Sequence, residues 1–198
     1  MILSNEGIRQ AIKNGQLEID PEPVKDQYTT SAVDLFLGSI FQQWDKTKFK
    51  VPGVHVELNL ADQEFQKTAQ AFLIKPKTEN DGSIILPPYD LSSCWPLLAM
   101  TRERAHLKHG SLLAARVEGR SSFARLGLIV HLTAPTIHSG FNGPITLEMI
   151  NHGPFYLKLI PDRTRICQLI IERLETQPAG DISTGFQGQI EPSGKKST

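Results

Sequence analysis

The sequence has little cysteine and no excess of either charge, and each shortage excludes a class of protein. Only two cysteines occur in 198 residues, Cys94 and Cys167. They are far apart and have no metal-ligand spacing, so we expect reduced, structural thiols. Lysine and arginine number 21, as do aspartate and glutamate, which gives a formal net charge of +0. Without a broad basic field that would hold nucleic acid, any bound anion must be held by a local site.

Long apolar runs are also missing. No stretch is long enough to span a bilayer. The start, "MILSNEGIRQAIKNGQ", lacks the basic segment and the apolar run of a signal peptide. We therefore expect a soluble, cytoplasmic protein with neither a membrane nor nucleic acid among its partners.

What the sequence does contain is a series of short apolar segments. Ser4 can cap a short helix with Ile8 and Ile12 at helical spacing, which ends near Asn14. From Ala32 onward, turn residues separate short runs such as "AVDLFLG", "VHVELNL", "AFLIKP", "SIILPP", "PLLAMT", "SLLAARVEG", "PITLEMIN", "FYLKLI" and "RICQLIIERL". Many short strands with turns between them predict an all-β sandwich, jelly roll or barrel.

The composition changes after Leu174. The last segment, "ETQPAGDISTGFQGQIEPSGKKST", is polar and rich in glycine, proline, serine and threonine. Such a composition is typical of a disordered tail, and it also suits a mobile lid. We assign residues 1–174 to one β domain and residues 175–198 to a flexible tail of the same domain.

The segment "EGRSSFARLG" places two serines between two arginines, Arg120 and Arg125. One interpretation is a short helix capped by serine, which buries Phe123 and Leu126 while both arginines face water. The other is an anion site, because helix-start N–H groups, hydroxyls and guanidinium forks all bind phosphate oxygens. Taken alone, the segment favours the first interpretation.

A later strand carries an isolated carboxylate. In "PITLEMIN", Ile145, Leu147 and Met149 fall on one face, and Thr146 and Glu148 on the other. Desolvation inside an apolar strand would raise the pKa of Glu148 and suit it to exchange protons at neutral pH. The alternative is an outward-facing, solvated glutamate.

These segments together resemble a known family. "EGRSSFARLGLIVHLTA" followed by "GFNGPITLEMIN" closely resembles the dCTP deaminase branch of the dUTPase-like superfamily, and "MILSNEGIRQAIKNGQLEIDP", "SAVDLFLG" and "RICQLIIERL" resemble its opening, early strand and last core strand. The resemblance implies a mainly-β, distorted jelly roll with a short N-terminal helix, assembled as a homotrimer with active sites between subunits. It also implies hydrolytic deamination of dCTP to dUTP and ammonia, with the tail folded over the triphosphate.

The resemblance also assigns roles to residues. Glu148 would shuttle a proton from water to the cytosine ring, and Ser121 with the carbonyl of Ala134 would hold that water. Arg125 from a neighbouring subunit would complete the catalytic set. The nucleotide would be bound by Arg120, Ser121, Ser122, Phe123, Ala124, Arg125, His131, Leu132, Thr133, His138, Thr146, Leu147, Glu148 and Gln189.

Mg²⁺ would accompany the triphosphate of dCTP without ligands from the protein. No zinc is expected, because His55 and Glu57 imitate half of a zinc deaminase motif but no Pro-Cys-x-x-Cys follows. We interpret both as ordinary strand residues. The resemblance also makes dTTP a candidate feedback inhibitor.

The sequence departs from the family at several positions. His138 stands where members commonly have the aspartate that activates water in dUTPases, and Phe36 replaces an arginine. In the tail, "GFQGQ" has Gly185 and Phe186 in place of Lys-Tyr, whereas Gln189 matches a phosphate-contacting glutamine. Two alternatives therefore remain beside a dCTP deaminase: a dUTPase or bifunctional enzyme, against which His138 argues, and a catalytically silent nucleotide-binding trimer.

Overall fold

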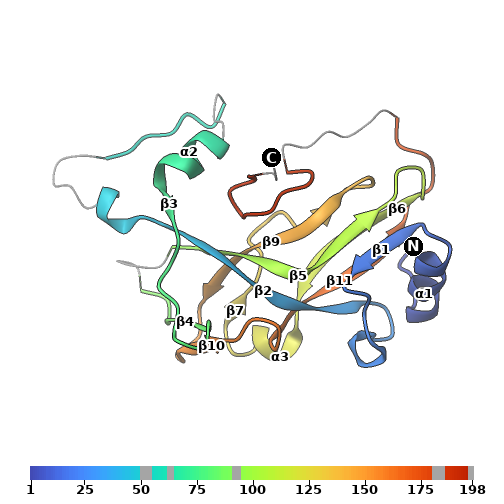
Figure 1. The fold of residues 1–198 in the computed structure, drawn as a ribbon, viewed down its shortest axis with the longest axis horizontal. Helices are drawn as coiled ribbons and strands as arrows, with labels where there is room; N and C mark the ends of the chain where they lie inside the picture. The colour runs from blue at the N-terminus through green and yellow to red at the C-terminus, as the bar shows by residue number, and fades with distance from the viewer. Residues whose placement is uncertain (50–54, 62–64, 91–94, 180–185, 196–198) are drawn as a thin grey trace.

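The computed structural model describes residues 1–49, 55–61, 65–90, 95–179 and 186–195. Cys94 and Gly185 lie outside these residues. The regular structure of the described chain is mostly β-strand, as the sequence predicts, with a few short helices at its margins (Figure 1).

Nine strands form one antiparallel sheet. Its central order is β7-β9-β5-β2-β11-β6-β8, while β1 also pairs with β5 and β3 with β2. A separate two-stranded sheet joins β4 to β10. The strands are β1 (Leu17–Asp20), β2 (Val33–Trp44), β3 (Leu73–Ile74), β4 (Ile84–Leu86), β5 (Leu97–Leu107), β6 (Leu113–Gly119), β7 (Leu128–Ile129), β8 (Thr136–Ile137), β9 (Asn142–Asn151), β10 (Leu157–Leu159) and β11 (Arg165–Arg173).

Breaks in the pairing register curl this sheet. The β2–β5 register shifts between Leu37 and Phe41, and the β5–β9 register shifts between Met100 and Arg104. Such irregularities bend a strand and increase its twist. The curl encloses one apolar core, and alternate residues of β6 and β9 point into it.

The helices agree only in part with the sequence. Helix α1 (Asn5–Lys13) begins at Ser4, whose Oγ accepts a hydrogen bond from the Gly7 amide at 3.2 Å, and ends at Asn14. This helix is confirmed. Helix α2 (Phe65–Phe72) was not expected, because "AFLIKP" reads as a strand. Its apolar residues Phe65, Ala69 and Phe72 recur at helical spacing, and only the next two residues pair as β3.

Three further expectations have clear outcomes. His55 and Glu57 lie in an exposed segment without regular structure, so the interpretation of them as strand residues is wrong. Cys167 is a free thiol fully buried in β11, where burial raises its pKa, in keeping with a structural role. Among the described residues, no helix is long and apolar enough to cross a membrane.

Candidate active site

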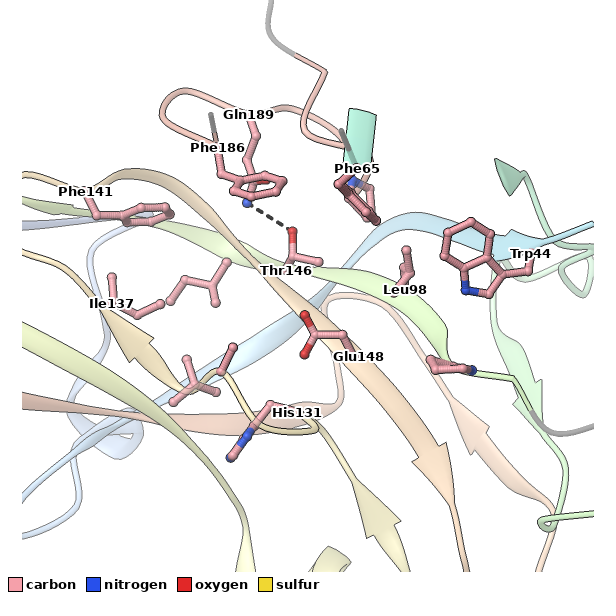
Figure 2. Close-up of a pocket in the computed structure, with 15 residues that line it drawn as sticks. Trp44, Phe65, Leu98, His131, Ile137, Phe141, Thr146, Glu148, Phe186 and Gln189 are labelled. Atoms are coloured by element: carbon pink, nitrogen blue, oxygen red, sulfur yellow. Dashed lines mark hydrogen bonds between the residues drawn. The ribbon is translucent and has the colours of Figure 1, made fainter. Parts of the chain in front are cut away.

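A cavity of about 440 Å³ opens between β9, β5 and the C-terminal segment. Its walls are mainly apolar. Four of the site residues expected from the sequence line it with polar side chains: His131, Thr146, Glu148 and Gln189 (Figure 2). The remaining lining residues are Trp44, Phe65, Pro96, Leu98, Val117, Ala134, Ile137, Phe141, Ile145, Phe186 and Pro192.

Glu148 points into this cavity from the middle of β9 (Figure 2). The predicted division of faces is confirmed: Leu147 and Met149 are fully buried in the core, whereas Thr146 and Glu148 line the cavity. Across the β9–β5 pair, Glu148 lies opposite Leu98, so an apolar side chain flanks the carboxyl group.

The surroundings of Glu148 favour its protonated form. Burial raises the pKa of Glu148 above its ordinary value, while a hydrogen bond from the Leu132 backbone and the nearby His131 pull the pKa down to a smaller extent. Because Glu148 is half-buried and lines the cavity, the solvated, outward-facing alternative is wrong. A carboxyl group of this kind can take and return a proton near neutral pH.

The loop between β7 and β8 brings two more expected residues to the cavity. His131 and Ala134 both line it, and Leu132 and Thr133 are exposed between them. Nε2 of His131 lies 3.9 Å from a carboxylate oxygen of Glu118. Its Nδ1 is buried and has no hydrogen-bond partner among the described residues.

The C-terminal segment 186–195 covers one side of the cavity (Figure 2). The side-chain nitrogen Nε2 of Gln189 donates to the Pro144 carbonyl and to Oγ1 of Thr146, each at 3.0 Å. The Gln187 side chain accepts from the Asn142 amide and donates to the Gly140 carbonyl, each at 2.8 Å. These contacts attach the segment to the start of β9, and mobility of the tail without ligand stays a prediction.

Two aromatic rings meet above this opening. Phe186 of the C-terminal segment and Phe65 at the start of α2 have ring centroids 5.8 Å apart. The Gln66 side chain also donates to the Gly194 carbonyl at 3.4 Å. Helix α2 and the C-terminal segment thus form one side of the cavity together.

The segment with the bracketed serines lies elsewhere. Helix α3 (Ser121–Ala124) is drawn at the opposite end of β9 from the C-terminal segment (Figure 1), and none of its residues lines the cavity. Ser121, Ser122, Ala124 and Arg125 are exposed.

The local form of this helix differs from the expectation. Its N-cap is Arg120 without a side-chain cap, so the prediction of a serine cap is wrong. Phe123 packs against the core as expected, whereas Leu126 is 42% exposed. The expectation that Arg120 only faces water is wrong. Its guanidinium lies 3.4 Å from the buried Asp34 carboxylate and over the Phe123 ring.

His138 is exposed just beyond β8 and does not line the cavity, although its neighbour Ile137 does. Among the described residues, no three His, Cys, Asp or Glu side chains come together in a group that could hold a metal ion.

The departure at Phe36 has a structural counterpart. The Arg102 guanidinium lies 4.3 Å from the centre of the Phe36 ring and donates to the fully buried Glu103 carboxylate at 2.5 Å. Glu103 also accepts from the Phe36 amide and from Gln27. Arg102 therefore supplies a guanidinium beside Phe36, where the family commonly has an arginine.

Sequence reasoning missed the aromatic walls Trp44, Phe65 and Phe141. Trp44 ends β2, and Phe65 begins the unexpected helix. No local signal marks them, because they reach the cavity only through strand pairing and the position of α2. Leu98 could have been found once β5 was known to pair with β9 in this register.

Comparison with known proteins identifies the family. The family model described as dCTP deaminase-like matches residues 2–174. The chain belongs to the dCTP deaminase-like family. A family relative from Halobacterium salinarum, a "dCTP deaminase, dUMP-forming", is 36% identical over 201 residues, which cover 99% of this chain and 94% of that protein. A dCTP deaminase from Rhodospirillum rubrum is 36% identical over 176 residues, 88% of this chain and 83% of that one.

A solved structure supports the same fold. The 2'-deoxycytidine 5'-triphosphate deaminase from Agrobacterium tumefaciens superposes with a TM-score of 0.58 and 20% identity, covering 86% of this chain and 47% of that one. The chain therefore spans about half the length of that structure. At this identity the match concerns the fold alone, and it supports the mainly-β fold predicted from the sequence.

Proposed function

We propose that this protein is a dCTP deaminase that hydrolyses dCTP to dUTP and ammonia. The observation that carries the proposal is Glu148, a half-buried carboxyl group with a raised pKa that points into an apolar cavity of nucleoside size. Membership in the dCTP deaminase-like family and relatives named dCTP deaminase over nearly the whole chain support the substrate.

In the proposed reaction, Glu148 acts as both base and acid. Its carboxylate takes a proton from water, which attacks C4 of the cytosine ring, and the proton passes to N3. Glu148 then takes the proton of the C4 hydroxyl of the tetrahedral intermediate and passes it to the amino group, so that the C4–N bond breaks, ammonia leaves and the uracil carbonyl remains. The carbonyl of Ala134, one of the lining residues, would hold the attacking water. The raised pKa of Glu148 matches this double use, since a group that alternates between its two forms works best near the operating pH.

The triphosphate requires a second set of residues. The described lining residues of the cavity include no lysine or arginine. Helix α3 exposes Ser121, Ser122 and Arg125 away from the cavity. We propose that a neighbouring copy in a homotrimer presents this helix to the triphosphate. In a closed, symmetric trimer, each subunit then contributes its cavity to one site and its helix α3 to the next.

The proposed nucleotide-binding set keeps the residues expected from the sequence. His131, Thr146, Glu148 and Gln189 act from the cavity, and Leu147 can contribute only backbone, because its side chain is fully buried. Mg²⁺ would arrive with the triphosphate and share its charge. The loop and partner-subunit positions are Arg120, Ser121, Ser122, Phe123, Ala124, Arg125, Leu132, Thr133 and His138.

A second candidate product is dUMP. The Halobacterium relative is named dUMP-forming, and such an enzyme must also release diphosphate. His138 opposes this alternative, because imidazole stands where dUTPases commonly place a water-activating carboxylate. We therefore propose dUTP as the product. Cytoplasmic location and feedback by dTTP stay predictions from the family resemblance.

Incubation of the purified protein with dCTP and Mg²⁺, with ammonia, dUTP, dUMP and diphosphate resolved, tests the proposal. Equal amounts of ammonia and dUTP are expected. Equal amounts of ammonia, dUMP and diphosphate would support the bifunctional alternative. Nucleotide binding without any product would support the silent trimer.

A further inference from the structure

Gln189 is the most deeply buried polar residue of the C-terminal segment around the cavity. Its exposed fraction is 4%, and it lines the same cavity as Glu148. A carboxamide has one end that only donates and one that only accepts hydrogen bonds. Which end faces the ligand therefore decides what Gln189 can recognise.

The donating end is already used by the protein. Nε2 of Gln189 has two acceptors at 3.0 Å, the Pro144 carbonyl and Oγ1 of Thr146. A backbone carbonyl cannot donate, so the amide cannot be turned around without placing two acceptors together. Oε1 is buried and has no hydrogen-bond partner among the described residues. An unpaired buried acceptor is unfavourable until a donor reaches it.

A phosphate oxygen is an acceptor and cannot satisfy Oε1. A hydroxyl group can. Gln189 is hydrogen-bonded to Thr146, which lies on the same face of β9 as Glu148 and two residues before it. That spacing is about 7 Å along a strand, comparable to the distance from the reacting edge of a pyrimidine to its sugar hydroxyl.

His138 is exposed and is not among the lining residues of this cavity, whereas Gln189 is. We propose that Oε1 of Gln189 accepts a hydrogen bond from the 3'-hydroxyl of the bound nucleoside, an inference that rests on the proposed function. Gln189 is thus a specificity-determining residue for the sugar, and it does not contact phosphate.

The test compares dCTP with 2',3'-dideoxy-CTP, which keeps the base and the triphosphate but lacks the 3'-hydroxyl. For the unmutated protein, kcat/KM of deamination should fall about 5- to 100-fold with the dideoxy substrate, because the buried acceptor is left unpaired. In Gln189→Met the two substrates should become nearly equal. A phosphate contact would instead lower kcat/KM for both substrates alike and leave their ratio unchanged, which would overturn the assignment.

A matched variant separates the acceptor from attachment of the segment. Gln187→Met removes two hydrogen bonds that hold the segment but leaves the Gln189 amide in place. This variant should keep the preference for dCTP, and equal loss of preference in both variants would contradict the inference. Turnover of dCTP without any preference in the unmutated protein would overturn the inference and leave the proposed function standing. No turnover of dCTP would overturn both.

Discussion

Glu148 lies directly opposite Leu98 in the antiparallel β9–β5 pair. This neighbour helps to exclude water from the carboxyl group, whose pKa is raised chiefly by burial. The proposed base must begin deprotonated, so deamination should fall as the pH drops through the raised pKa of Glu148. The acidic limb of the profile of kcat/KM against pH should therefore lie above the ordinary value of 4.5.

Leu98→Ser tests the cause of that shift. The smaller, polar side chain admits water beside the carboxyl group, so the pKa of Glu148 should fall and the acidic limb should move to lower pH. Leu97→Ser is a useful contrast, because Leu97 lies opposite Met149 on the core face. That variant should lose stability, and any folded fraction should keep the original acidic limb.

Glu148→Gln should abolish turnover while leaving the fold intact. A general acid–base group contributes about 10²- to 10⁴-fold, and Glu148 serves both proton transfers. The variant should also gain heat stability at neutral pH. A carboxyl group whose pKa is raised by folding contributes stability that is fully present below its unfolded-state pKa and is lost as the pH rises through the folded-state value. Glutamine carries no such loss.

The pH dependence of Tm checks the direction of this change in stability. Glu148→Gln should melt above the unmutated protein at neutral pH, and the difference should shrink as the pH approaches 4.5. A variant that melts lower at neutral pH would show that the carboxylate is stabilised by the fold, against the burial argument.

Two glycines hold helix α3 against the end of β9. A Cβ at Gly127, where φ is +92°, would lie 2.1 Å from the Gly153 nitrogen. Gly127→Ala should therefore lower the free energy of unfolding by at least about 2 kcal/mol, since both strain and a backbone clash oppose it. Gly82→Ala is the control, because φ is +75° there but no atom lies within 4 Å. It should cost about 1 kcal/mol from strain alone. Equal losses in urea unfolding would show that the close contact is unimportant.

The product depends on His138. Neutral imidazole differs from a carboxylate in reach and geometry, and protonated imidazole cannot act as a base. The unmutated protein should therefore release no diphosphate from dCTP or dUTP, while His138→Asp should release some if the loop places the carboxylate suitably. Stoichiometric diphosphate from the unmutated protein, measured by a coupled phosphatase assay, would contradict the assignment.

How much could be predicted from the sequence depends on how local the signal is. The strand with Glu148 shows its faces in its own alternation, and Ser4 caps α1 with its own side chain, so both were predictable. Helix α2 was missed, since "AFLIKP" has the β-forming residues of a strand and its helical spacing begins before the segment. The aromatic walls were missed for a different reason: they belong to distant segments that only the curled sheet brings together.

The direction in which Gln189 points could not be predicted either. The family pattern identifies the glutamine, but its hydrogen bonds to Pro144 and Thr146 are contacts across 45 and 43 residues of sequence. Likewise, the guanidinium beside Phe36 comes from Arg102 on a neighbouring strand. A comparison of position 36 alone therefore suggests that the guanidinium group has been lost.

Complementation between two inactive variants tests the central claim that each site combines Glu148 of one subunit with Arg125 of another. Glu148→Gln and Arg125→Gln, each inactive alone, are co-expressed with different tags, and mixed trimers are isolated on both tags. Every cyclic trimer that carries both variants has one of its three sites with both residues intact, so ammonia release from dCTP should recover to about a third of the unmutated rate. Two differently tagged copies of Glu148→Gln provide the control and should stay inactive. Mixed trimers of the two variants that release no ammonia would contradict the account.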